Sequence, residues 1–170
     1  MAYKPFDLTG KVALVTGGNS GIGLGMADAM AQAGAAIVIW GTNAEKNAAA
    51  EAQLMAHGVK VLAQTVDVAD EAAVTAGFAE AVRQMGRVDT VIANAGIGCG
   101  AKSFSEFPTD TWRRVLGVNL DGVFFTFREA CKHMVERAGA GDPGGSLVVT
   151  SSLSAISGAA LSVDGGWTAT

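Results

Sequence analysis

The sequence predicts an α/β fold in which helices cover a doubly wound parallel sheet of about five strands. Short runs rich in Val and Ile alternate with Ala-rich stretches of helical length along the chain. Three glycines fall just past helical stretches, where a residue without a Cβ closes the last turn: Gly34, Gly58 and Gly86. The hydrophobic fraction is 49% over 170 residues, which suffices for a substantial core and excludes global disorder.

Five apolar runs are predicted to be strands, because each is short and rich in Val or Ile, and most are flanked by Gly, Asn, Asp or Ser. They lack the apolar–polar alternation of half-exposed strands, so we expect them to be buried, as in a parallel sheet. The predicted strands are Val12–Thr16, Ala36–Trp40, Val59–Ala63, Val88–Ala93 and Leu147–Ser151.

The stretches between these runs are predicted to be helices. The last one is expected to be a single long helix whose apolar side chains form one stripe that needs a partner. The predicted helices are Gly21–Ala33, Ala44–His57, Asp70–Met85 and about Asp110–Ala138. The stripe consists of Trp112, Leu116, Leu120, Val123, Phe127 and Met134.

Composition argues against several classes of partner. The net charge of −4 comes without any run of Lys or Arg, so no nucleic-acid partner is expected. No apolar run approaches the ~18 residues that span a bilayer, and the start lacks a signal-peptide core, so a cytoplasmic protein without a membrane segment is expected. Cys99 and Cys131 have no CxxC spacing or His partner, which predicts reduced cysteines and no metal site.

The first predicted strand runs directly into a glycine-rich turn that opens a helix. Glycines there let backbone N–H groups and the positive helix end approach a pyrophosphate. The spacing of Gly17, Gly21 and Gly23 is Gly-x3-Gly-x-Gly, which differs from the usual Gly-x-Gly-x-x-Gly. The turn therefore indicates a dinucleotide site, with a tight structural turn as the alternative.

Three further motifs follow this turn in order. Asn94-Ala95-Gly96 comes after the fourth predicted strand, Asn119 stands in a Val-Asn-Leu-Asp-Gly segment, and Ser151-Ser152 ends the fifth strand. With these motifs the chain resembles the short-chain dehydrogenase/reductase family, whose fold is Rossmann-like. The resemblance runs from about Asp7 to Gly158 and resumes over Leu161–Gly166.

The resemblance implies NAD or NADP as cofactor and a small alcohol or carbonyl compound as substrate. In the family the glycine turn binds the pyrophosphate, an aspartate after the third strand contacts adenine, and the Asn-Ala-Gly segment borders the adenosine. The residues implied to bind cofactor are Thr16, Gly17, Asn19, Ser20, Gly21, Ile22, Gly23, Thr42, Asp67, Val68, Asn94, Ala95 and Gly96. For catalysis it implies that Ser152 orients the substrate oxygen and Asn119 holds a proton-relay water.

The choice between NAD and NADP stays open. NAD selection usually needs a carboxylate on the ribose about 20 residues past the glycine turn. The end of the second strand, Trp40-Gly41-Thr42-Asn43, offers no acid before Glu45, which favours NADP. NADP-using relatives often carry Arg where this chain has Ser20, which weakens that preference.

The family's catalytic Tyr-x-x-x-Lys is missing. The position thirteen after Ser152 is Gly165, no lysine follows Lys132, and the single tyrosine, Tyr3, precedes the first strand. We therefore expect one dinucleotide-binding domain over 1–170, with a deletion of roughly 60 or more residues between Ala160 and Leu161.

The bridge left by this deletion has nine residues, 152–160. A parallel return across a sheet normally takes a dozen or more residues, and nine residues span at most about 30 Å. The closing segment, 161–170, is therefore expected to be displaced from its place in the family's sheet.

These observations support three hypotheses. The chain is an NAD(P)-dependent oxidoreductase, catalytically impaired as written; a non-catalytic dinucleotide-binding remnant; or a truncated chain that associates through an exposed helix face. The first two are favoured over the third by Gly17, Gly21, Gly23, Asp67 and Asn94. The missing Tyr and Lys favour the second over the first. A fourth hypothesis is that the sequence as written lacks residues that the protein has.

An exposed apolar patch is expected to be formed by Phe124, Phe125 and Phe127, so a homo-oligomer is predicted.

Overall fold

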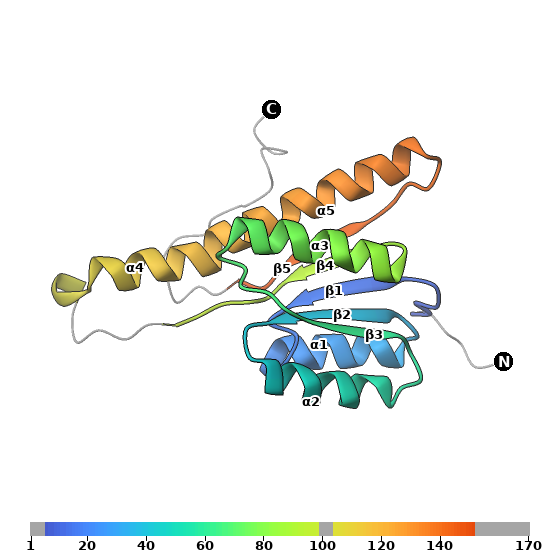
Figure 1. The fold of residues 1–170 in the computed structure, drawn as a ribbon, viewed down its shortest axis with the longest axis horizontal. Helices are drawn as coiled ribbons and strands as arrows, with labels where there is room; N and C mark the ends of the chain where they lie inside the picture. Colours follow the sequence, from blue (N-terminus) through green and yellow to red (C-terminus); the bar gives the residue numbers. More distant parts are fainter. Residues whose placement is uncertain (1–5, 99–103, 152–170) are drawn as a thin grey trace.

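The computed structural model describes residues 6–98 and 104–151. Within them lies a five-stranded sheet whose strands are all parallel, in the order β3-β2-β1-β4-β5 (Figure 1). The α/β class and the doubly wound topology predicted from the sequence are confirmed. The strands are β1 (Val12–Thr16), β2 (Ala36–Gly41), β3 (Val61–Thr65), β4 (Thr90–Ala93) and β5 (Ser146–Val149).

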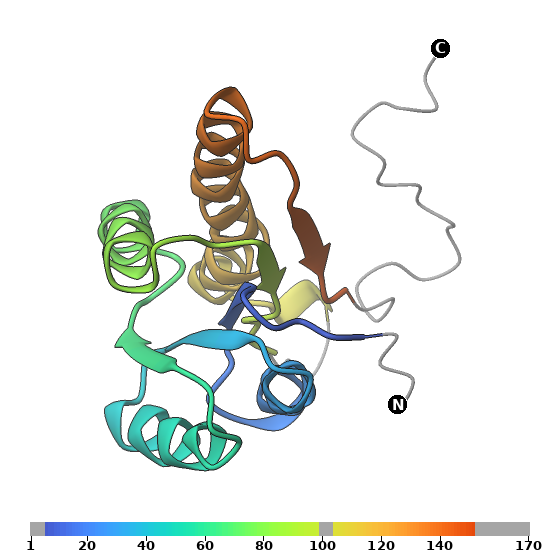
Figure 2. The same ribbon diagram turned by 90° about the vertical axis from the view of Figure 1, so that its right-hand side faces the viewer.

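Helices cover both faces of the sheet, as Figure 2 shows. Along β1, Ala13 and Val15 face one side while Val12 and Leu14 face the other, since side chains alternate along a strand. The first pair packs with α1 (Gly21–Gln32) and α2 (Ala44–Met55), and the second pair with α3 (Glu71–Met85) and α5 (Gly122–Gly139). The central strands are therefore buried on both faces.

Local signals fix the ends of these helices. The Asn43 side chain caps α2 by accepting from the N–H of Lys46, and the Asp70 side chain caps α3 in the same way. Gly86 closes α3 with a φ of 82°. The two other predicted stops, Gly34 and Gly58, also have positive φ, so this prediction is confirmed.

The long helix predicted over about 110–138 is confirmed in its extent, because helical backbone runs without a break from Thr109 to Gly139, but it contains a π-helical turn that the sequence did not predict. The chain forms α4 (Thr109–Leu116), a π-helical segment (Gly117–Asp121) and α5, preceded by a short 3-10 turn (Phe104–Glu106). A Cβ on Gly122 would lie only 2.8 Å from Val68 Cγ2, so the start of α5 packs closely on the loop that follows β3.

Some strand boundaries also differ from the prediction. β3 begins at Val61 rather than Val59, because its register with β2 pairs Val61 with Ile37. β4 begins at Thr90, two residues later than predicted. β5 begins one residue before its predicted start and ends two residues before its predicted end.

The fifth strand was expected to be buried, and that expectation is wrong. Leu147, Val148 and Val149 are 37%, 42% and 47% exposed. The reason is that β5 is the edge strand, and within the described residues it pairs with β4 alone. The predicted deletion after Ala160 and the tail 161–170 lie outside the described residues.

The predicted apolar patch on α5 is only partly exposed. Phe124 is 58% exposed, whereas Phe125 and Phe127 pack against the core on the α3 side of the sheet. Among the helices that the structure describes, none is long and apolar enough to cross a membrane.

Candidate functional site

The sheet has a topological switch point between β1 and β4. After β1 the chain passes through α1 to β2, while after β4 it leaves toward β5 on the other side. Connections that diverge in this way leave a crevice outside the carboxyl ends of the strands. An open pocket of about 600 Å³ lies there, lined by the segments that follow β1, β2, β3 and β4 and by side chains of α2, α4 and the π-helical segment.

Most of the predicted cofactor-binding residues come together in this pocket. Ten of the thirteen line it: Gly17, Asn19, Ser20, Ile22, Thr42, Asp67, Val68, Asn94, Ala95 and Gly96. The other three, Thr16, Gly21 and Gly23, do not line it and instead shape the turn. That any of the thirteen residues binds a cofactor stays a prediction.

Thr16 joins the ends of β1 and β4. Its side chain is buried, and its Oγ1 accepts from the backbone N–H of Asn94 at 3.0 Å and of Ala95 at 2.9 Å. In return, Asn94 Nδ2 donates to the carbonyl oxygen of Thr16 at 3.1 Å. These bonds hold the glycine turn and the Asn94–Gly96 segment together as one unit.

The glycines allow these two segments to approach closely. A Cβ on Gly23 would overlap the carbonyl oxygen of Gly17 and the side-chain amide of Asn94. Gly17 itself has a φ of 65°, and a Cβ there would lie 3.0 Å from Ala95 Cα. Gly17 and Gly23 are therefore required by close contacts at the switch point, whereas Gly21 is favoured by its φ of 54°.

Sequence reasoning missed eight residues that line the pocket. Two of them, Lys46 from α2 and Arg114 from α4, carry positive charge, while Asp67 supplies the single carboxylate among the lining residues that the structure describes. An excess of cations suits a ligand with phosphate groups. The eight missed residues are Trp40, Gly41, Asn43, Lys46, Val66, Ile97, Arg114 and Val118.

Asn119, one of the two predicted catalytic residues, lies in the π-helical segment next to the pocket. Its Oδ1 accepts from the N–H of Ile97 at 2.9 Å, and its Nδ2 donates to the carbonyl oxygen of Ile97 at 3.1 Å. Its side chain thus clamps the loop that follows β4. Ser152, the other predicted catalytic residue, lies outside the described residues.

Neither histidine lines the pocket. His57 Nε2 lies 2.8 Å from Asp28 Oδ1, and the hydrogen bond between them lowers the pKa of Asp28. His133 lies where β4 begins, and its Nε2 accepts from the N–H of Val88 at 3.1 Å. Burial and the charge of Arg137 lower the pKa of His133 below its usual value. Over residues 6–98 and 104–151 no cluster of His, Cys, Asp or Glu could hold a metal ion.

A cluster of charges lies at the opposite edge of the sheet, where the strands begin. Asp89 accepts from the N–H of Val12 at 2.9 Å and from Arg87 Nε at 2.9 Å, and lies 3.2 Å from Arg137. Burial alone would raise the pKa of Asp89, but the hydrogen bonds from Arg87 and Val12 bring that pKa below its usual value. Asp142 also pairs with Arg137, at 2.9 Å, and anchors the loop before β5.

The fold and the motifs at the switch point have counterparts among known proteins. Residues 11–163 match the family described as short chain dehydrogenase. The chain belongs to the short-chain dehydrogenase family. The resemblance inferred from the sequence motifs is thereby confirmed, whereas the deletion itself stays a prediction.

Relatives of this chain within the short-chain dehydrogenase family are named for different substrates. Gluconate 5-dehydrogenase of Gluconobacter oxydans (strain 621H) is 39% identical over 132 residues, which cover 78% of this chain and 51% of that protein. An NADP-dependent (R)-specific alcohol dehydrogenase of Lentilactobacillus kefiri is 42% identical over 127 residues, covering 75% of this chain and 50% of that protein.

Solved structures of this family share the fold. The crystal structure of an NAD+-bound xylitol dehydrogenase superposes with a TM-score of 0.83 at 32% identity, covering 89% of this chain and 56% of that one. The chain therefore spans about half the length of the relatives that it matches.

Proposed function

We propose that this chain binds NAD or NADP in the pocket at the switch point, as the cofactor domain of a short-chain dehydrogenase. One observation carries the proposal: the glycine turn after β1 is locked to the end of β4 and borders an open pocket with two cations. The relatives support it, since one is named NADP-dependent and another was solved bound to NAD+.

The residues of the pocket fit such a cofactor. Gly17 and the start of α1 at Ser20 offer the pyrophosphate an approach free of large side chains and near a positive helix end. Asp67 and Val68 would border the adenine, with Thr42 beside the ribose. When bound, the nicotinamide ring supplies the chemistry of hydride transfer.

For the complete reaction we propose an oxidoreductase that acts on a small alcohol or carbonyl compound and that is catalytically impaired in the 170-residue form. The sequence holds no Tyr-x-x-x-Lys after Ser152 to move the proton that accompanies the hydride. Asn119 is engaged at both ends of its amide by Ile97. The alternative is a remnant that binds dinucleotide and has no catalytic role.

Two measurements test this proposal. Calorimetric titration with NADH and NADPH is expected to show binding, and no detectable binding of either would refute the proposed function. An absorbance assay at the nicotinamide band, on a panel of alcohols and ketones, is expected to show no turnover. Turnover by protein whose intact mass matches 17.2 kDa would refute the proposed loss of catalysis. The variant Ser152→Ala would then test whether the remaining activity depends on the Ser152 hydroxyl.

A second proposal is self-association, which one observation favours. Trp112, Leu120 and Phe124 are 50%, 61% and 58% exposed along α4, the π-helical segment and α5. Light scattering after gel filtration is expected to give a homo-oligomer, and Phe124→Glu should shift it toward monomer. The cytoplasmic location expected from the sequence stays a prediction, which cell fractionation tests.

A further inference from the structure

Asn47 is a buried polar side chain with no role in the site described above. It lies in α2, and only 4% of its surface is exposed. A buried amide costs about 1–3 kcal/mol when its hydrogen-bonding groups have no partners. The partners of Asn47 therefore show what this residue holds in place.

The amide nitrogen of Asn47 binds the ends of two strands. Its Nδ2 donates to the carbonyl oxygen of Gly41 at 3.0 Å, where β2 ends, and to that of Gln64 at 3.1 Å in β3. Gly41 pairs with Thr65, the neighbour of Gln64, in the sheet. One side chain thus fixes α2 to the edge of the sheet that borders the pocket.

The oxygen of the same amide reaches the glycine turn. Asn47 Oδ1 accepts from Asn19 Nδ2 at 2.7 Å. Asn19 lines the pocket, whereas Asn47 does not. The position of a residue on the pocket wall is therefore set by a residue behind it.

Gly41 makes this contact sterically feasible. A Cβ on Gly41 would overlap the Asn19 amide nitrogen and would lie 2.6 Å from Asn47 Oδ1. Gly41 ends β2, about 20 residues beyond the glycine turn, where a carboxylate usually selects NAD. In this chain the space beside that position holds two neutral amides.

We propose that Asn47 is a positioning residue for dinucleotide binding, acting through Asn19, which it holds against the end of β2. The proposal rests on the proposed function, since it assigns a role within the same pocket. A neutral amide pair carries no charge that would attract or repel a 2′-phosphate. Loss of Asn47 should therefore weaken the binding of NADH and NADPH by the same factor.

The test is a double-mutant cycle measured by calorimetric titration of NADH and of NADPH. Asn47→Leu and Asn19→Ala are each expected to weaken binding about tenfold, as for the loss of one well-formed hydrogen bond. The double variant should also lose about tenfold, rather than the roughly hundredfold of independent effects. A role limited to stability would not produce this coupling in affinity.

Thr126→Val is the matched control. Thr126 is also a fully buried polar residue in a helix, and its Oγ1 donates to the carbonyl oxygen of Gly122 at 2.7 Å, but it does not line the pocket. Its loss should lower stability and leave both dissociation constants unchanged.

Each outcome of the cycle supports or refutes the positioning role of Asn47. Losses that multiply in the double variant, or unchanged affinity in folded Asn47→Leu, would overturn the role of Asn47 while leaving the proposed function intact. If Asn47→Leu does not fold, Gly41→Ala replaces it, because the new Cβ displaces Asn19. Gly41→Ala should weaken binding about tenfold alone and little further in the Asn19→Ala background. Wild-type protein that binds neither cofactor would refute both the proposed function and this inference.

Discussion

The two edges of the sheet are held together by different means, although the same strands run through both. Where β1 and β4 end, neutral groups join them: the Thr16 hydroxyl and the Asn94 amide bond to backbone atoms, and Gly23 allows close contact. Where they begin, charges join them: Asp89 binds the N–H of Val12 together with Arg87 and Arg137.

Because of this difference, we expect ligand binding to depend on the carboxyl edge and stability to depend more on the edge where the strands begin. The carboxyl edge keeps its own polar groups satisfied by short neutral bonds. Among the described residues, the cations of the pocket, Lys46 and Arg114, lie at this edge, away from the ion pairs of Asp89. At the beginning of the strands, ion pairs of Asp89 with Arg87 and Arg137 close the edge instead. Variants at the two edges should therefore affect affinity and stability separately.

The largest effect is expected for Gly23→Ala. Its Cβ would overlap the Gly17 carbonyl and the Asn94 amide, and relieving about 3 kcal/mol of overpacking would shift the turn and weaken dinucleotide binding about a hundredfold. Gly25→Ala is the control in the same helix, because a Cβ there meets nothing within 4 Å. Equal affinities of the two variants by calorimetry would contradict the role of Gly23.

Asp89→Asn tests the opposite edge. Removing a carboxylate that is 9% exposed leaves Arg137, itself 11% exposed, without its buried partner, and should cost about 3 kcal/mol in the free energy of unfolding by urea. Dinucleotide affinity should not change. Asp142→Asn is the control, since Asp142 is 51% exposed and should cost much less. A loss of affinity in Asp89→Asn would show that the two edges are coupled.

Thr16→Val should cost about 2 kcal/mol in the free energy of unfolding, because it leaves the N–H groups of Asn94 and Ala95 without their acceptor. Unlike Asp89→Asn, it should also weaken dinucleotide binding, since Asn94 and Ala95 line the pocket. Thr16→Ser keeps the hydroxyl and should retain most of the affinity. A Ser variant as weak as the Val variant would assign the effect to the methyl group instead.

His133 gives the start of β4 a pH dependence. Its Nε2 accepts from Val88 only when unprotonated, and its pKa is lowered in the folded state. Stability is therefore complete above the unfolded pKa of about 6.5 and is lost as the pH falls through the lower folded pKa. His133→Gln, whose amide oxygen can accept from Val88, should flatten this part of the urea-midpoint profile. Parallel profiles would contradict the assignment.

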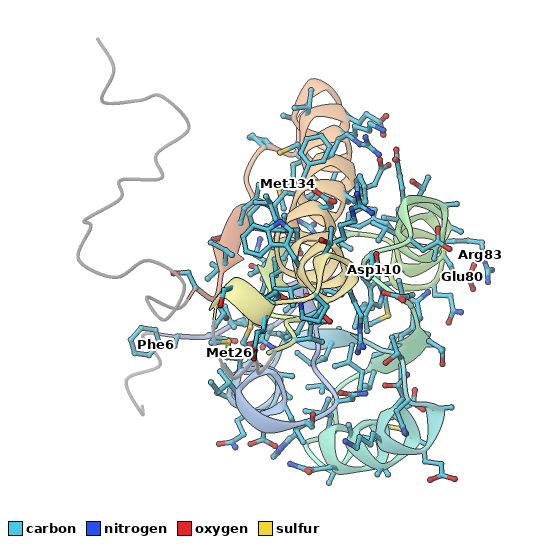
Figure 3. The ribbon with its side chains drawn as sticks, turned by 90° about the vertical axis from the view of Figure 1, so that its left-hand side faces the viewer. Phe6, Met26, Glu80, Arg83, Asp110 and Met134 are labelled. Carbon is cyan, nitrogen blue, oxygen red and sulfur yellow. The ribbon has the colours of Figure 1, made fainter. Side chains whose placement is uncertain are left out.

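The smallest effect is expected for an exposed pair on α3. Glu80 accepts from Arg83 Nε at 2.6 Å, and Figure 3 shows both side chains on the outer side of the helix. The hydrogen bonds from Arg83 and Gln84 lower the pKa of Glu80 to about 2. Solvent screens such a pair, so Glu80→Gln should leave the urea midpoint at pH 7 unchanged within error. A clear shift would show that ion pairs stabilise this protein even away from the strand edges.

The sequence predicted those parts of the molecule that depend on local signals. β1 has its predicted bounds, and the glycine stops at Gly34, Gly58 and Gly86 follow from backbone conformation alone. β3 shifted by two residues because pairing of Val61 with Ile37, a contact between distant segments, sets its start. The π-helical segment lies just before Gly122, which packs closely on Val68, and hydrophobic periodicity reveals neither feature.

The candidate site divides in the same way. The residues of the glycine turn and of Asn94–Gly96 were identified because each motif is continuous in the chain. Lys46, Arg114 and Asn47 were missed because they lie on helices, where a polar residue usually faces solvent. The packing of α2 against β2 and β3 brings Lys46 and Asn47 to the pocket or its support, and Arg114 lines the pocket from α4.

The bonds from Thr16 to Asn94 have a consequence for the order in which the protein is made. They join residues 78 positions apart, and the order of the sheet places β4 beside β1 only after β2 and β3 have been synthesised. A nascent chain that ends before Asn94 can form local strand–helix units, but it cannot yet assemble the crevice. A dinucleotide would therefore stabilise only chains that have completed β4, and it cannot assist the earlier stages of folding on the ribosome.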